Sequence, residues 1–195
     1  MKYLIVLFLF MAQLTSAQLP KDPKDISPLL IGENIPKVSV KKVDGTDIPM
    51  KDVLNSKKSV LVFYRGGWCP YCNLHLSELQ KAESEILELG YQIVAISPDS
   101  PKNLQKTEEK DEIKYQLFSD ANGELIKAMG IGFKAPFKYN LMLKSKSGGE
   151  NEDSLLPVPS VFVVDENGTI LFEYIDPDYK TRLSSKLLLA VLKNI

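Results

Sequence analysis

The sequence predicts an α/β fold in which a central mixed β-sheet lies between two layers of helices. Three observations support this prediction. Short, strongly apolar runs alternate with segments of helical periodicity along the 195-residue chain. Residues 59–97 read as strand, helix, strand, the order typical of a parallel pair with its crossover. Two apolar runs at 160–164 and 169–174 flank an Asn-Gly turn and predict an antiparallel hairpin at the other end of the sheet.

The first strands are short. Residues 38–43 alternate apolar and polar side chains, Asp44-Gly45 forms a turn, and a second strand ends near Met50. The run from Ser59 to Arg65 is apolar almost without interruption and predicts a strand that is buried on both faces.

The next segment is the main helix. Residues 69–89 place apolar side chains on one face at helical spacing, and Gly90 ends the helix. A second buried strand follows at 91–97. Pro101 then opens a charged helix that runs to Asp111.

The C-terminal half alternates in the same way. A short strand at 115–118 and a short helix at 122–129 precede the segment 133–156, which is expected to be irregular. After the hairpin, an apolar helix at 183–192 closes the fold. The complete order is therefore a crossover unit followed by a hairpin and a final helix.

Composition and length indicate one globular domain. The chain is 44% hydrophobic and 25% charged, with a formal net charge of −1. This balance gives no electrostatic reason to expect a nucleic acid partner or an anionic membrane surface. The expected division is a signal peptide at 1–17, an extended arm rich in Pro, Lys and Asp at 18–37, and the folded domain at 38–195.

The N-terminus has the pattern of an export signal. Lys2 precedes the apolar run from Leu4 to Met11, and Thr15-Ser16-Ala17 supplies small residues at a cleavage site. The apolar run is too short to span a bilayer, although an uncleaved anchor is the alternative. The prediction is an exported protein, periplasmic or secreted, with no stable membrane insertion after the signal is removed. Disulfides persist in those compartments.

Both cysteines of the chain lie in the sequence Trp68-Cys69-Pro70-Tyr71-Cys72. A strand that delivers two cysteines to the first turn of a helix predicts a dithiol–disulfide redox centre. Pro70 suits the first helical position, where its missing N–H costs nothing. Cys69 should be reachable at the open helix end, where the dipole favours a thiolate, and Cys72 should be sheltered in the apolar stripe.

Other interpretations of the pair are weaker. Inert core cysteines do not account for the Pro-Tyr spacer at a helix start, and a structural staple closing so small a ring removes little chain entropy. A zinc site needs about four ligands, whereas the chain has two cysteines and one histidine. That histidine, His75, lies one turn after Cys72 and has either a packing or a direct role. No cofactor or metal is predicted.

From about Ile26 to Ile195 the chain resembles the alkyl hydroperoxide reductase / thiol-specific antioxidant (AhpC/TSA) branch of the thioredoxin superfamily, the peroxiredoxin-like proteins. The resemblance implies a thioredoxin-like three-layer sandwich. It is carried by the segments Leu61–Cys72, Phe118–Glu124, Pro157–Asp165 and Ile175–Leu183. It also implies that Trp68, Pro70 and Tyr71 support the site, and that Pro159 is the cis-proline that faces the dithiol in thioredoxin folds.

The chain departs from the family pattern at three positions. Gly66 stands where peroxiredoxins carry a Thr or Ser three residues before the peroxide-attacking cysteine, and Pro159 lies near the place of their arginine. Both missing groups orient the peroxide, although Arg65 is a candidate substitute for their charge. Phe63 replaces the buried acid that lies behind the thioredoxin dithiol.

These observations predict an exported thiol–disulfide oxidoreductase in which Cys69 attacks and Cys72 resolves, with an external thiol donor, a thioredoxin-like protein or a small thiol. The missing peroxide-positioning groups favour disulfide exchange. The first alternative is a thiol-dependent peroxidase acting on hydrogen peroxide or organic hydroperoxides. The second is a copper-binding thioredoxin-fold module, which the lack of a distal histidine disfavours.

Overall fold

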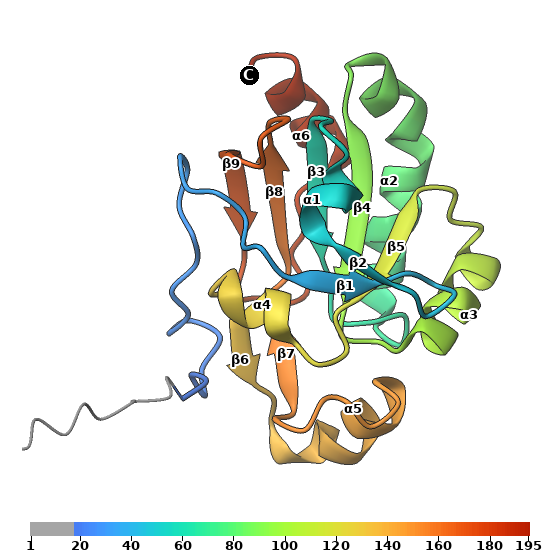
Figure 1. Ribbon diagram of the computed structural model, residues 1–195, viewed down its shortest axis with the longest axis vertical. Coiled ribbons are helices and arrows are strands. Elements are labelled where there is room, and N and C mark those ends of the chain that lie inside the picture. The colour runs from blue at the N-terminus through green and yellow to red at the C-terminus, as the bar shows by residue number, and fades with distance from the viewer. Residues whose placement is uncertain (1–17) are drawn as a thin grey trace, which may run out of the picture.

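The computed structural model describes residues 18–195, and the predicted signal peptide lies outside this range. A seven-stranded mixed sheet forms the centre of the molecule, with helices on both faces (Figure 1). The strand order is β2-β1-β5-β4-β3-β8-β9. The predicted three-layer sandwich is confirmed.

The helices and strands follow the predicted order closely. The strands of the main sheet are β1 (Ser39–Lys41), β2 (Asp47–Pro49), β3 (Ser59–Phe63), β4 (Gln92–Ser97), β5 (Gln116–Ser119), β8 (Ser160–Val164) and β9 (Ile170–Ile175). The helices that flank it are α1 (Met50–Leu54), α2 (Pro70–Glu88), α3 (Pro101–Asp111), α4 (Glu124–Ala128) and α6 (Ser185–Leu192). The short helix α1 was not predicted.

The sheet changes direction on either side of its parallel centre. β3 pairs in parallel with β4, and β4 with β5, whereas β8 runs antiparallel to both β3 and β9. Every residue of β3, β4 and β8 is buried, which explains why these strands read as continuous apolar runs.

Alternate residues of β3 point into two separate cores. Val60 and Val62 join the apolar side chains of α2, α3 and α6 on one face of the sheet. Leu61 and Phe63 join those of α1 and α4 on the other face. The two sulfur-bearing side chains, Cys69 and Cys72, belong to the first core. The dithiol is therefore built into the packing between α2 and the sheet.

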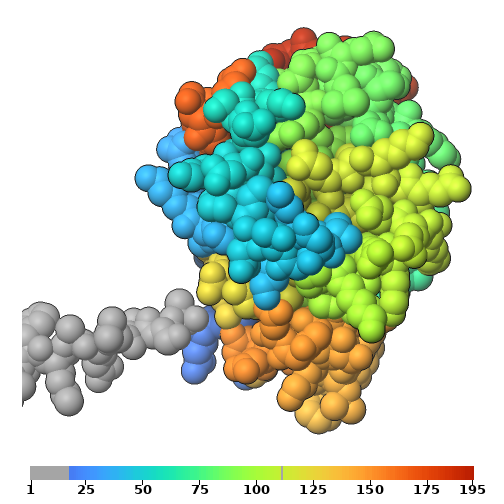
Figure 2. Space-filling model, turned by 45° about the vertical axis from the view of Figure 1, so that its right-hand side comes forward, coloured from blue at the N-terminus to red at the C-terminus, as the bar shows by residue number. Residues whose placement is uncertain are grey.

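The prediction of an irregular segment at 133–156 is wrong. This part of the chain contains β6 (Gly132–Lys134), a 3₁₀ turn η1 (Phe137–Tyr139), α5 (Asn140–Lys146) and β7 (Leu155–Pro157), and β6 pairs antiparallel with β7. The elements are too short to give a sequence period, which is why the pattern did not reveal them. They form a lobe beyond one end of the main sheet, orange in Figure 2.

The segment at 18–37 lies along the second core. Leu19, Leu29 and Ile35 pack against that core, and the Leu29 N–H donates to the Met129 carbonyl at 3.1 Å. Asn34 forms an isolated bridge with Thr169. This segment thus contributes apolar contacts to the fold.

Phe162 should be a principal stabilising residue of the sheet. Its side chain is fully buried, and its ring meets that of Phe63 edge-on, with 5.9 Å between centroids. Phe162→Ala should lower the free energy of unfolding in denaturant by about 3–5 kcal/mol. The matched control is Phe137→Ala, because Phe137 is 88% exposed; it should change stability by less than about 0.5 kcal/mol. Equal effects of the two substitutions would contradict this packing.

Candidate active site

The dithiol lies at the start of α2. Cys69 is the N-cap residue, with extended backbone angles, and Pro70 is the first helical residue as predicted. Both cysteines are free thiols in this structure, and the Cys72 thiol donates a hydrogen bond to the Cys69 sulfur. The strand β3 ends six residues earlier, so the Arg65–Trp68 loop carries the chain from the sheet to the first cysteine.

The prediction that Cys69 is exposed is wrong. Cys69 is 1% exposed and Cys72 is fully buried. Helical geometry predicted an open helix end, but segments that come later in the chain pack over this end. Tyr139 of η1 and Tyr179, which follows β9, both lie at the Arg65–Trp68 loop. The site is consequently closed to large molecules in this conformation.

Arg65 lies at the centre of the residues that pack over Cys69, which are Arg65, Trp68, Tyr139 and Tyr179. Its guanidinium is buried among three aromatic rings, at 5.0 Å from the centroid of Trp68, 5.4 Å from Tyr139 and 4.5 Å from Tyr179. Trp68 also contacts Tyr139, with 5.9 Å between ring centroids, and Tyr71 meets Tyr179 edge-on at 5.8 Å. Cation–π contacts are strongest where water is excluded, so the contacts of the buried Arg65 should be strong. Because the three rings come from segments far apart in the chain, these contacts hold those segments together.

Arg182 is the second guanidinium at the dithiol. Its Nη2 donates to the Cys72 Sγ at 3.4 Å. Arg182 was not among the predicted site residues. The composition offered a clue to Arg182, because Arg65 and Arg182 are the only arginines in the chain and its other basic side chains, apart from one histidine, are lysines. Both of them lie at the two cysteines.

The two thiols have opposite pKa shifts. The hydrogen bond from Cys72 lowers the pKa of Cys69 to about 6, against the effect of burial, and the charges of Arg65 and Arg182 lower it further. The pKa of Cys72 is raised well above its ordinary value by its hydrogen bond to Cys69 and by burial. Cys69 is therefore the thiolate of the pair at neutral pH.

The two glycines before Trp68 are needed for close packing. Gly66 has a φ of +133°, and a Cβ there would lie 2.5 Å from the Trp68 Nε1 and 2.8 Å from the Asp99 carboxylate. A Cβ on Gly67 would lie 2.0 Å from the Thr107 Oγ1. The position that carries a hydroxyl residue in the resembled family therefore has no room for one here.

Asp99 fixes the Arg65–Trp68 loop by a hydrogen bond. Its carboxylate is buried and accepts the Gly67 N–H at 2.8 Å. Burial raises the pKa of Asp99 to about 6. Asp99 was not among the predicted site residues, because a single aspartate after a strand forms no recognisable pattern.

The prediction of a cis bond at Pro159 is wrong, since residues 18–195 contain no cis peptide bond. The chain passes from β7 to β8 through Val158, whose N–H donates to the Ile131 carbonyl at 2.9 Å. The Pro159 carbonyl accepts the Asp176 N–H at 3.3 Å. These bonds hold the chain in an extended path, for which the trans form is the ordinary one.

Pro159 lies near the site on the His75 side. Together with Phe63, His75 and Arg182 it lines a small hollow that has no space for a water molecule. His75 is 5% exposed, and burial, assisted by the charge of Arg182, lowers its pKa to about 4. His75 is therefore neutral at physiological pH, and Phe63 leaves the hollow without a carboxylate.

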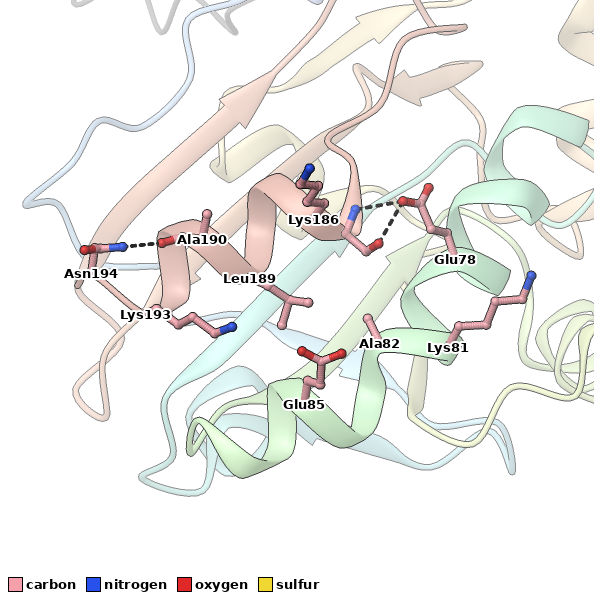
Figure 3. Close-up of a pocket in the computed structure, with 10 residues that line it drawn as sticks. Glu78, Lys81, Ala82, Glu85, Lys186, Leu189, Ala190, Lys193 and Asn194 are labelled. Carbon is pink, nitrogen blue, oxygen red and sulfur yellow. Dashed lines mark hydrogen bonds between the residues drawn. The ribbon is translucent and has the colours of Figure 1, made fainter.

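A wide groove among the described residues lies elsewhere. It has a volume of about 610 Å³ and runs between α2 and α6 (Figure 3). At one end Glu78 accepts the backbone N–H and the hydroxyl of Ser185, at 2.8 and 2.9 Å. These bonds tie the start of α6 to α2, three residues after Arg182.

Residues 18–195 have neither of two other features, a metal site or a membrane-spanning helix. In this range no three His, Cys, Asp or Glu side chains converge as a metal site. Within the same residues, none of the helices has the length and apolar character needed to cross a bilayer.

Comparison with known proteins agrees with this geometry. A profile of the AhpC/TSA family matches residues 31–172. The chain belongs to the AhpC/TSA family. It is therefore a peroxiredoxin-like, thiol-dependent oxidoreductase with a thioredoxin-like fold, as the resemblance implied.

Individual relatives are distant. Peroxiredoxin Bcp of Escherichia coli is 24% identical over 168 residues, covering 86% of this chain and 98% of the relative. Thiol-disulfide oxidoreductase ResA of Bacillus cereus is 23% identical over 158 residues, covering 80% and 76%. Among solved structures, reduced Prx3 of Vibrio vulnificus in complex with H₂O₂ superposes with a TM-score of 0.72 at 16% identity, covering 85% of this chain and 97% of that one. This last likeness shows the fold.

The low pKa of Cys69 gives a testable pH dependence. Below about pH 6 the Cys69 sulfur is protonated, and only the thiolate reacts with iodoacetamide. Alkylation of the reduced protein should therefore rise with pH, with a midpoint near 6, and mass spectrometry should find the label on Cys69. The denatured protein is the control and should show a midpoint of about 8.5. A native midpoint equal to the denatured one would contradict the assignment.

Proposed function

We propose that the protein is a thiol-dependent peroxidase that reduces hydrogen peroxide or a small organic hydroperoxide. The Cys69 thiolate attacks one peroxide oxygen and the O–O bond breaks. Cys69 becomes a sulfenic acid, and the other oxygen takes up a proton and leaves as water or an alcohol. Cys72 then condenses with that sulfenic acid to give an internal disulfide and water. An external thiol donor, a thioredoxin-like protein or a small thiol, restores the dithiol.

The burial of both sulfurs is the observation that carries this proposal. Cys69 is 1% exposed, and Cys72 has no exposed surface. A protein disulfide would have to bring its own backbone to Cys69 through the cluster of Arg65, Trp68, Tyr139 and Tyr179. A peroxide has two oxygen atoms at its reacting end, so it can reach Cys69 with far less displacement of these four side chains.

The charges at the site also favour a peroxide. Negative charge develops on the leaving oxygen as the peroxide bond breaks, and a preorganised positive group stabilises it. The sequence suggested disulfide exchange because Gly66 and Pro159 lack the usual peroxide-positioning groups. Arg65 and Arg182 bring two guanidinium groups to the same sulfurs from other positions, which removes the main argument against a peroxide.

Disulfide exchange is the second candidate. The Trp-Cys-x-x-Cys sequence and the match to a thiol-disulfide oxidoreductase favour it. In that reaction Cys69 forms a mixed disulfide with a partner and Cys72 displaces the reduced product. Both candidates share the oxidised state, an internal Cys69–Cys72 disulfide.

We also infer that residues 1–17 direct export, so that the domain works in the periplasm or outside the cell. The apolar run after Lys2 and the small residues up to Ala17 support this inference.

Two cysteine variants test the proposal. Cys72→Ser keeps a hydroxyl donor beside Cys69, so it should still react with hydrogen peroxide and stop at the sulfenic acid. A 1,3-dione probe should capture that species on Cys69, detected by mass spectrometry. Cys69→Ser should capture none, because the remaining thiol, Cys72, has no exposed surface and its burial still disfavours the thiolate. Wild-type protein should meanwhile consume peroxide faster than it reduces insulin disulfides when dithiothreitol is the donor.

Two outcomes would contradict the proposal. If Cys69→Ser formed the sulfenic acid and Cys72→Ser did not, the roles of the two cysteines would be reversed. If wild-type protein reduced insulin readily and left peroxide unchanged, disulfide exchange would be the function.

A further inference from the structure

Arg182 is held in place before any substrate arrives. Its Nη1 donates to the backbone carbonyls of Tyr179 and Thr181, the latter at 2.6 Å, while its Nη2 donates to the Cys72 Sγ at 3.4 Å. The Arg182 side chain is half-buried. Its guanidinium is therefore fixed by its own loop and aimed at the second sulfur of the pair.

The loop that carries Arg182 is itself fixed at both ends. Before it, the Asp176 carboxylate accepts the Asp178 N–H at 2.9 Å. After it, Leu183 is buried in the first core, and Ser185 donates twice to Glu78 of α2 (Figure 3). Because α2 also carries both cysteines at its start, one helix fixes the distance between Arg182 and the dithiol.

Four titratable or charged side chains lie around the dithiol. Cys69 at the helix cap and Arg182 in the loop before α6 act directly on Cys72, whereas Arg65, in the loop after β3, acts on Cys69 through its charge and on Cys72 through its backbone N–H. His75 of α2 is affected by the charge of Arg182. His75 is neutral, and Arg65 is enclosed by aromatic rings. Of these four groups, Arg182 is the one whose cation makes a hydrogen bond to Cys72.

We propose that Arg182 is a catalytic residue that acts on the second sulfur of the pair. Its guanidinium stabilises the Cys72 thiolate after Cys69 has been oxidised. This role rests on the proposed function, because a sulfenic acid must form on Cys69. The hydrogen bond to Cys72 exists in either case.

The order of events follows from electrostatics. In the reduced enzyme, the hydrogen bond to Cys69, burial, and the negative charge of Cys69 raise the pKa of Cys72, and Arg182 opposes them. When Cys69 becomes a neutral sulfenic acid, its negative charge is gone. The attraction of Arg182 then favours the Cys72 thiolate without opposition from that charge. Oxidation of the first cysteine thus activates the second.

The resolving step balances without a further reactant. The Cys72 thiolate attacks the Cys69 sulfur, the S–S bond forms and the S–O bond of the sulfenic acid breaks. The leaving hydroxide takes the proton that Cys72 gave up and departs as water. The two electrons that reduced the peroxide are then accounted for by the oxidation of two thiols to one disulfide.

The first experiment measures the pKa of Cys72 without any peroxide. In the Cys69→Ser background, thiolate absorbance should be titrated with Arg182 present and with Arg182→Gln. An opposite charge at this range shifts a pKa by about 1–3 units, so the Gln variant should have a pKa higher by about one unit or more. Lys186→Gln, which removes an exposed positive charge from α6, is the matched control and should leave it unchanged. Equal Cys72 pKa values with and without the Arg182→Gln substitution would overturn the proposal.

The second experiment follows closure of the disulfide in the intact dithiol. After one equivalent of hydrogen peroxide, Arg182→Gln should form the internal disulfide at least about tenfold more slowly than wild type, and the 1,3-dione probe should capture the waiting sulfenic acid. Arg182→Lys should close at an intermediate rate, because it keeps the charge and loses the fork of donors. Closure of Arg182→Gln at the wild-type rate would overturn the proposal.

The two measurements separate this role from the proposed function. If wild-type protein forms no sulfenic acid, the peroxidase function fails, and the Cys72 titration still decides whether Arg182 acts on that thiol. Thermal unfolding of each variant shows that it is folded, and the Lys variant supplies the comparison if Arg182→Gln does not fold.

Discussion

The buried guanidinium of Arg65 is the interaction on which the site depends. A cation removed from water needs compensation, and the rings of Trp68, Tyr139 and Tyr179 supply it at 4.5–5.4 Å. Such contacts contribute about 2 kcal/mol each where they are desolvated. The three rings come from the loop before α2, from η1 and from the chain after β9. One side chain therefore closes three segments over the dithiol and places a positive charge beside Cys69.

This arrangement reconciles burial with a reactive thiolate. Burial alone raises the pKa of a thiol, and it has this effect on both cysteines. At Cys69 the hydrogen bond from Cys72, with the help of two guanidinium charges, outweighs it. A closed, positively charged site suits a small substrate that accepts electrons at oxygen. The same closure means that a protein donor of electrons must meet an opened form, since oxidised sulfurs at these positions would be covered as well.

The sequence predicted what is encoded locally. The buried strand at Ser160–Val164, the helix at Pro101–Asp111 and the role of Pro70 at the start of α2 follow from short-range patterns, and the structure confirms them. The burial of Cys69, the geometry at Pro159 and the part played by Arg182 depend on contacts between segments that lie far apart in the chain. No period or spacing within one segment encodes such contacts. The rarity of arginine was the one clue in the sequence to the role of Arg182, because both arginines of the chain lie at the dithiol.

The buried, positively charged site should accelerate attack on a peroxide beyond what a thiolate achieves in water. The most direct measurement mixes reduced protein with hydrogen peroxide in a stopped-flow instrument and follows the fluorescence of Trp68, which adjoins Cys69. We expect a second-order rate constant at least about a hundredfold above that of a free small thiol, compared at equal thiolate fraction. A rate constant equal to that of the free thiolate would contradict it.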